Sequence, residues 1–168
     1  VMMGAGYFNP LTGYMNKADA LSVATDMKTA SGLFWPTPVL NLVEDAGNIK
    51  AGDRIALKDP NVEGHPILAV MDVEAVEEFS DEEKAMITEK VYRPSKEEAH
   101  PGVDAFNAQG KVCLSGPIKV LNFSYFQTEF PDTFRTAVEI RNEIAERGWK
   151  KVVAFQTRNP MPLAHEEL

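Results

Sequence analysis

The sequence contains a single cysteine, Cys113, so neither an internal disulfide nor a multi-cysteine metal site can form. No apolar run approaches the roughly 20 residues that a membrane-spanning helix needs, and no secretory leader is expected at the start. Basic residues are also scarce: 17 Lys and Arg stand against 25 Asp and Glu, for a formal net charge of −8. Because nucleic-acid-binding domains usually carry a basic surface, this balance disfavours one. These absences favour a reduced, cytoplasmic protein, and a small anionic ligand stays possible.

The length and composition fit an ordinary globular chain, with 168 residues of which 44% are hydrophobic and 25% charged. That is enough for one domain, or for one small domain plus part of another. Both ends resemble the interior of a protein. The start, Val1-Met2-Met3, is apolar, and residues 165–168 resemble the first turn of a helix. We therefore expect an internal piece of a longer protein.

The first 125 or so residues predict a mainly β domain with short helices. Two helix starts stand out: Asn16 with Asp19 at the N3 position, and Ser80 with Glu83 in a capping box. They predict helices over 17–27 and from Ser80 to about Glu89. Residues 4–15 are rich in Gly, Pro and Asn and predict a loop. Strands are expected over 39–43, 55–58, 67–76, 112–114 and 118–121, the last two separated by the Gly-Pro pair at 116–117.

The pattern changes near residue 130. Residues 131–133 predict the start of a helix with one apolar stripe, supported by an i,i+4 pair of Glu143 and Arg147 and ended by Gly148. Four apolar residues without alternation follow at 152–155, which is typical of a strand buried on both faces of a parallel sheet. The last 40 or so residues therefore predict the opening βα unit of an α/β domain.

A polar loop follows this expected strand and leads into an expected helix. Open α/β sheets bind ligands at the carboxyl ends of their strands, and a helix N-terminus favours phosphate or sulfate. Arg158 offers a planar fork of N–H donors suited to an oxyanion, while Gln156, Thr157 and Asn159 are neutral donors. The simpler alternative, to which the local pattern gives about even odds, is a capped connection in which Arg158 is only a surface charge.

The loop, with the sequence QTRNPMPLAHE over 156–166, resembles the ATP sulfurylase signature Gln-Thr-Arg-Asn-Pro-Met-His-x-x-His-Glu. Five other stretches resemble the same family in the same order. They are GYFNPLTGYM at 6–15, DPNVEG at 59–64, HPGV at 100–103, LSGPI at 114–118 and FPDTFR at 130–135. The likeness is strongest to the prokaryotic homodimeric branch.

The resemblance implies a PUA-like β-barrel over 1–125 and the start of a Rossmann-like nucleotidylyltransferase domain over 126–168. The implied enzyme is a sulfate adenylyltransferase, which converts ATP and sulfate to adenylyl sulfate and pyrophosphate. It serves sulfate assimilation or, in reverse, sulfur oxidation. Mg²⁺ would accompany ATP, with no tightly bound cofactor and no protein-held metal. The resemblance also implies a homodimer, without nucleic-acid or membrane partners.

The resemblance further implies roles for individual residues. Gln156 and Arg158 would bind sulfate, and Thr157, Arg158 and Asn159 would act at the active site. The motif histidines fall at positions 162 and 165, so His165 would serve the phosphates and the transition state. Because sulfate needs no deprotonation to attack, a loop of donors without a central Asp or Glu suits this reaction.

Position 162 departs from the motif, because it holds Pro162 in place of histidine. Leu163 also stands where arginine is common in related forms. Proline is well tolerated at the first position of a helix, so the fold should survive. The lost donor is expected to cost on the order of 10²–10³ in rate. The sequence therefore leaves open a catalytically silent homologue. It also leaves open a PUA-like RNA-binding module, which filter binding with structured RNA would test.

The remaining candidates have simpler interpretations. The three histidines, His65, His100 and His165, are not at metal-ligand spacing. We expect His65 to be an exposed turn residue, His100 to be structural and Cys113 to be a buried small hydrophobe. The expected core or interface aromatics are Phe34, Trp35 and Trp149, and the expected surface charges are Arg54 and Lys58.

Overall fold

The computed structural model describes residues 1–93, 100–157 and 159. The chain divides into two compact units, Val1–Phe134 and Arg135–Leu168. The family resemblance places a domain boundary at 125/126, and that division stays a prediction.

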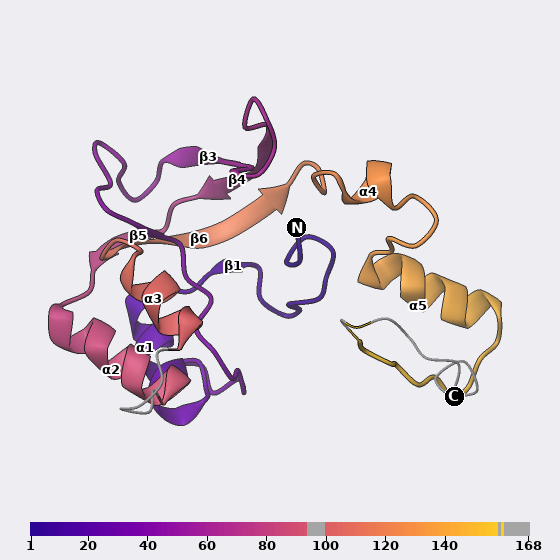
Figure 1. The fold of residues 1–168 in the computed structure, drawn as a ribbon, viewed down its shortest axis with the longest axis horizontal. Coiled ribbons are helices and arrows are strands. Elements are labelled where there is room, and N and C mark those ends of the chain that lie inside the picture. The colour runs from indigo at the N-terminus through magenta and orange to yellow at the C-terminus, as the bar shows by residue number, and fades with distance from the viewer. Residues whose placement is uncertain (94–99, 158, 160–168) are drawn as a thin grey trace. The chain divides into compact units, whose positions relative to one another are not determined.

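The first unit is built on six antiparallel strands among the described residues (Figure 1). The longest, β6, lies between β1 and β4, and β3 pairs with the far edge of β4. The amino end of β6 also pairs with β2 and β5. The bounds of the strands are β1 Gly13–Tyr14, β2 Leu42–Val43, β3 Arg54–Lys58, β4 Ile67–Asp72, β5 Ala75–Glu78 and β6 Val112–Val120. The bounds of the helices are α1 Lys17–Asp26, α2 Asp81–Tyr92, α3 Pro101–Asn107 and α4 Phe126–Glu129.

The core lies on both faces of this sheet, because neighbouring residues of a strand point to opposite faces. Cys113 packs with the helical side, in a cluster that includes Phe79 and Ile87. Leu114, the next residue, packs with Met71 on the other face. The expected mainly β region with short helices and the buried Cys113 are thereby confirmed.

Two of the expected strand boundaries in the sheet are wrong. Residues 67–76 do not form one strand, because the chain bends between β4 and β5, and residues 112–120 form one strand with no break. Met71 is opposite Ile118 but Ala75 is opposite Ser115, so the register shifts by one residue at the bend. The break expected at the Gly-Pro pair of 116–117 therefore lies in the strands opposite it, between β4 and β5. The sequence pattern of one strand does not show such a shift, because it depends on how two strands pair.

Close packing of β1 on β6 explains a strand that the sequence predicted as loop. A Cβ atom on Gly13 would lie 1.9 Å from the carbonyl oxygen of Gly116. Only glycine allows the two backbones to approach this closely. β2 is shorter than expected, since only Leu42 and Val43 of the 39–43 stretch pair with β6.

The helix caps of the first unit are confirmed. Asn16 Oδ1 accepts the backbone N–H of Asp19 at 2.8 Å, and Ser80 and Glu83 form the full capping box. α2 continues to Tyr92, three residues past the expected end. α3 and α4 were not expected. The expected structural role of His100 is confirmed, because its Nδ1 accepts the backbone N–H of Gly102 at 3.0 Å at the start of α3.

The second unit contains α5, Ala137–Glu146. The helix begins at the Thr136 cap and not at 131–133, because Thr136 and Glu139 form a capping box there. The pair of Glu143 and Arg147 is confirmed at 2.7 Å, and Gly148 follows with a left-handed φ of 64°.

The expected strand over 152–155 is not formed, and Val153 is 84% exposed. A strand needs a hydrogen-bonded neighbour, and the described residues of this unit contain no other strand. The aromatic expectations are also partly wrong. Phe34 and Trp149 are 64% and 52% exposed, so neither belongs to the core.

Candidate functional site

The described part of the loop presents three neutral polar side chains to solvent: Gln156, Thr157 and Asn159. Thr157 Oγ1 accepts the backbone N–H of Asn159 and donates to its carbonyl oxygen, both at 3.1 Å. This local turn holds Asn159 close to Thr157 without any partner from elsewhere in the chain. Within the described residues, the side-chain amides of Gln156 and Asn159 make no hydrogen bond.

Three residues of the predicted site, Arg158, Pro162 and His165, lie outside the described residues. Their roles stay predictions. What the described loop offers chemically is a set of amide and hydroxyl groups, and two exposed lysines precede it in the sequence, at 150 and 151. No Asp or Glu lies between Arg147 and His165 in the sequence. Such a surface is suited to an oxyanion, because donors and positive charge lower the energy of negative oxygens.

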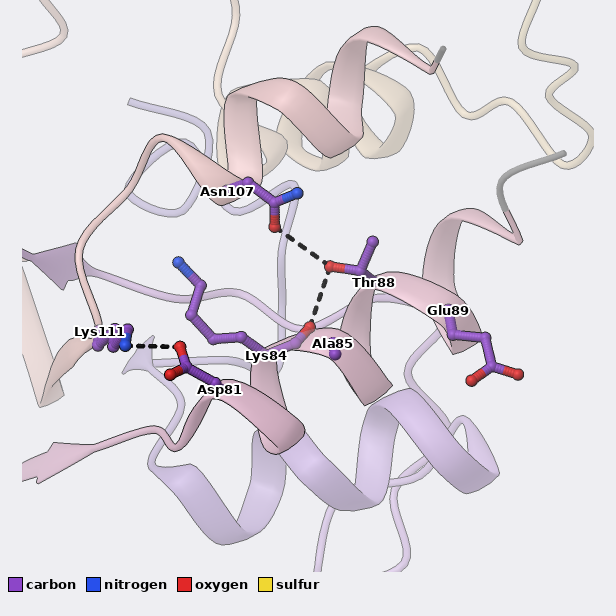
Figure 2. Close-up of a pocket in the computed structure, with 7 residues that line it drawn as sticks. All are labelled: Asp81, Lys84, Ala85, Thr88, Glu89, Asn107 and Lys111. Atoms are coloured by element: carbon purple, nitrogen blue, oxygen red, sulfur yellow. Dashed lines mark hydrogen bonds and ion pairs between the residues drawn. The ribbon is translucent and has the colours of Figure 1, made fainter. Parts of the chain in front are cut away.

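A cavity of about 390 Å³ lies elsewhere, between α2 and α3 (Figure 2). Asp81 and Lys111 form an ion pair of 2.5 Å at its edge. The pair lowers the pKa of the Asp81 carboxyl and raises the pKa of Lys111. Thr88 Oγ1 donates to the Lys84 carbonyl oxygen at 3.0 Å. The lining therefore carries charges of both signs, of which Asp81 and Lys111 form an ion pair.

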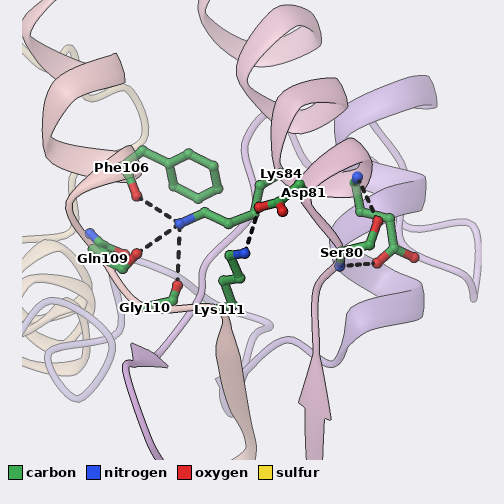
Figure 3. Close-up of polar contacts among 8 residues, drawn as sticks. Ser80, Asp81, Lys84, Phe106, Gln109, Gly110 and Lys111 are labelled. Atoms are coloured by element: carbon green, nitrogen blue, oxygen red, sulfur yellow. Dashed lines mark hydrogen bonds and ion pairs between the residues drawn. The ribbon is translucent and has the colours of Figure 1, made fainter.

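Lys84 is the most unusual side chain of this cavity, because it is only 8% exposed. Its ammonium group donates to three backbone carbonyls, those of Gln109 at 2.7 Å, Gly110 at 3.3 Å and Phe106 at 3.4 Å (Figure 3). Burial lowers the pKa of Lys84. With all three donors occupied, the side chain anchors α2 to the end of α3 and has no N–H left for a ligand.

The burial of Lys84 was not predicted from the sequence. Its spacing to Ile87 and Val91 puts all three on one face of α2. That spacing was the available signal, but a lysine on an apolar stripe usually reaches out to solvent.

Other chemistry-bearing groups offer little among the described residues. No cluster of three or more His, Cys, Asp or Glu residues there could hold a metal ion. His65 is exposed, as expected. Burial raises the pKa of the Cys113 thiol to about 12, so it is not a reactive thiolate at neutral pH. No helix in the described part of the chain is long and apolar enough to cross a membrane.

Two protein families match this chain, and their boundary lies near the division between the two compact units. A PUA-like domain family matches residues 1–123, and the ATP-sulfurylase family matches residues 131–168. Among solved structures, a hexameric APS kinase from Thiobacillus denitrificans is similar to 99% of this chain and 27% of its own, with a TM-score of 0.65. At 24% identity, this likeness supports the fold alone.

Curated relatives match along the whole length. A sulfate adenylyltransferase of Allochromatium vinosum is 66% identical over 168 residues, which is 100% of this chain and 42% of the relative. That of the Riftia pachyptila sulfur-oxidizing endosymbiont is 63% identical over 99% of this chain and 38% of its own. The chain thus spans less than half the length of these relatives. It belongs to the PUA-like domain family, and over its full length it corresponds to part of the sulfate adenylyltransferases that it resembles.

Proposed function

We propose that this chain forms part of a sulfate adenylyltransferase, which makes adenylyl sulfate and pyrophosphate from ATP and sulfate. The proposal concerns a whole protein of this type, because the chain spans 42% of its relative from Allochromatium vinosum. The observation that carries it is the loop at 156–159. Its described side chains are exposed neutral donors, and two hydrogen bonds join the Thr157 hydroxyl to the backbone of Asn159.

The reaction suits such a loop. A sulfate oxygen attacks the α-phosphorus, an O–P bond forms, and the bond to pyrophosphate breaks with its electron pair on the leaving oxygen. No proton has to be removed from sulfate, so positioning and electrostatic stabilisation supply most of the catalysis. In this proposal Gln156 and Arg158 hold sulfate. Thr157, Arg158, Asn159 and His165 contact the reacting groups.

Mg²⁺ fits this arrangement as the companion of ATP. The described loop offers neutral oxygens and no carboxylate, whereas Mg²⁺ usually keeps several waters and binds substrate phosphates. When bound, the ion would offset charge on the pyrophosphate. We extend the proposal to a homodimer, to a cytoplasmic location where ATP is available, and to a domain division at 125/126.

A chimaeric enzyme tests the proposal. The Allochromatium vinosum protein would carry this chain in place of its own matching segment, where the two are 66% identical. We expect adenylyl sulfate-dependent formation of ATP from pyrophosphate. A chimaera that folds but stays at background would favour a silent homologue, and Pro162→His would then show whether the missing histidine is the cause.

Arg158→Ala in the active chimaera isolates the loop. We expect its turnover to fall on the order of 10²–10³-fold, since one preorganised donor is lost. Lys150→Ala is the matched control, because Lys150 is an exposed cation that lies outside the 156–159 loop. Equal losses in the two variants would show that Arg158 is only a surface charge.

A further inference from the structure

The segment that follows β6, residues 121–134, is called the exit segment. Its first residues are hydrogen-bonded to β4. The backbone N–H groups of Leu121 and Asn122 both donate to the carbonyl oxygen of Leu68, at 2.7 and 3.3 Å. The Asn122 side chain donates to the carbonyl of Ile67 at 2.6 Å. These bonds lie beyond the last paired residue of β6, so they fix the first residues of the exit segment against β4.

Asp59 holds the same exit segment from the turn between β3 and β4. It is only 3% exposed. One carboxylate oxygen accepts the N–H of Asn61 at 2.9 Å, and the other accepts the hydroxyl of Ser124. Its backbone N–H donates to the carbonyl of Pro66 at 2.9 Å, and the His65 ring nitrogen lies 3.0 Å from its carbonyl oxygen. The carboxylate is therefore part of a closed turn, and its one hydrogen bond to a side chain outside that turn, among the described residues, is with Ser124.

Ser124 is held in an uncommon conformation. Its φ is 61°, in the left-handed region that non-glycine residues rarely occupy. Its N–H donates to Asn122 Oδ1 at 2.8 Å, while its hydroxyl donates to Asp59. A strained backbone of this kind persists when surrounding contacts determine it. The two bonds from Asn122 and Asp59 are such contacts.

Beyond Ser124, aromatic side chains of the segment contact one another. The ring of Phe134 lies 5.5 Å from that of Phe123 and 5.8 Å from that of Phe126. Phe130 remains 48% exposed. The aromatic group thus stabilises the segment internally, and Asn122 and Ser124 attach it to the sheet.

We infer that Asp59 acts as a latch, meaning that its buried carboxylate holds the exit segment 121–134 against the β3–β4 turn through the hydrogen bond from Ser124. The latch sets where the chain leaves the sheet on its way to the second unit. It goes beyond the proposed function and stands on contacts within the first unit, so it would hold even if the chain had no adenylyltransferase role.

Hydrogen exchange of the 168-residue chain tests the latch. In Asp59→Ala, we expect amides of 122–130 to exchange at least about tenfold faster, with Met71 and Leu114 unchanged. Asp45→Ala is the matched control. Asp45 also accepts a turn N–H, that of Gly47 at 2.8 Å, but lies exposed in another loop. Unchanged exchange at 122–130, or equal acceleration across the sheet, would overturn the latch.

Ser124→Ala removes the same bond from its other end and decides the matter if Asp59→Ala does not fold. Residues that act through one contact are non-additive. The double variant should therefore exchange at 122–130 no faster than the faster single variant. If the two accelerations multiply, Asp59 and Ser124 act independently and the latch is wrong.

Discussion

The helices α2 and α5 begin in the same way but differ in what they bury. Ser80 and Glu83 form a capping box at the start of α2, and Thr136 and Glu139 form one at the start of α5. α2 buries Lys84 and Ile87, whereas α5 has no buried residue. Val138, on the apolar stripe of α5, is 65% exposed.

This difference separates two sources of helix stability. A capping box satisfies orphan N–H groups and marks where a helix begins. It adds little to a helix of about ten residues, which is marginal in water unless an apolar face is buried. α5 has the clearer apolar stripe of the two helices, but no residue of it is fully buried, and Ala137 and Ile144 are only half-buried. The first unit therefore holds its structure through its core, and the second holds it through local contacts.

The largest expected effect is in amide exchange. Val152, Val153 and Ala154 make no hydrogen bond within the described residues, while Met71 lies in a paired strand and is fully buried. We expect the Met71 amide to exchange on the order of 10³-fold more slowly than that of Val153, since a core amide opens only with the whole unit. Hydrogen exchange resolved by NMR measures both. Similar protection would mean that the second unit has a core of its own.

Substitution of apolar side chains should sharpen the same contrast. Met71→Ala should lower the free energy of unfolding by roughly 2–5 kcal/mol, because it leaves a cavity in a packed core. Val153→Ala, at a side chain 84% exposed, should change it by less than about 0.5 kcal/mol. Urea denaturation of the two variants provides the comparison. A loss above 1 kcal/mol for Val153→Ala would place that valine in a buried contact.

A substitution of Lys84 tests how much its buried hydrogen bonds stabilise the first unit. Lys84→Met keeps much of the side-chain volume but leaves three carbonyls without their donor, so a loss of roughly 1–3 kcal/mol is expected. Lys90→Met, on the exposed side of the same helix, is the control and should be close to neutral. Thermal unfolding of both variants measures the difference. A stabilised Lys84→Met would mean that burying the charge costs more than its three hydrogen bonds return.

The local parts of the fold were predictable, and the non-local parts were not. Asn16 and Ser80 marked helix starts correctly because a cap depends on residues only three apart in sequence. The one-residue shift opposite Ser115 depends on how two strands distant in sequence pair, and no pattern within either strand encodes it. α5 shows a different limit: its cap is local, with Thr136 and Glu139 only three residues apart, but the Pro-Asp-Thr at 131–133 offered a competing local helix start.

For the candidate site, the sequence predicted which residues belong to the loop but not the structure around them. Gln156, Thr157 and Asn159 were selected by chemistry and motif, and the turn between the last two agrees with that selection. The strand expected before them did not form, because four apolar residues specify burial but not the neighbour that provides it. Lys84 was missed for a related reason: its place on an apolar face was visible, but the three carbonyls that accept from it lie 22 to 26 residues away in the sequence.

The smallest expected effect is the acid response of the latch. The hydroxyl of Ser124 and the N–H of Asn61 stabilise the Asp59 carboxylate and lower its pKa below the ordinary value. A carboxyl with a lowered folded pKa adds stability above its unfolded pKa, near 4, and that stability is lost as the pH falls through the folded value. Asp59→Asn cannot titrate, so the gap in stability between wild type and variant should be largest at pH 7 and shrink below about pH 4. Asp59 is one of 25 acidic residues, so its share of the total acid response is small and only the difference between the two proteins reveals it. Urea unfolding at pH 7, 5, 4 and 3 measures that difference, with Asp45→Asn as an exposed-carboxyl control. A gap that stays constant over this range would mean that the charge of Asp59 does not contribute to its hold on Ser124.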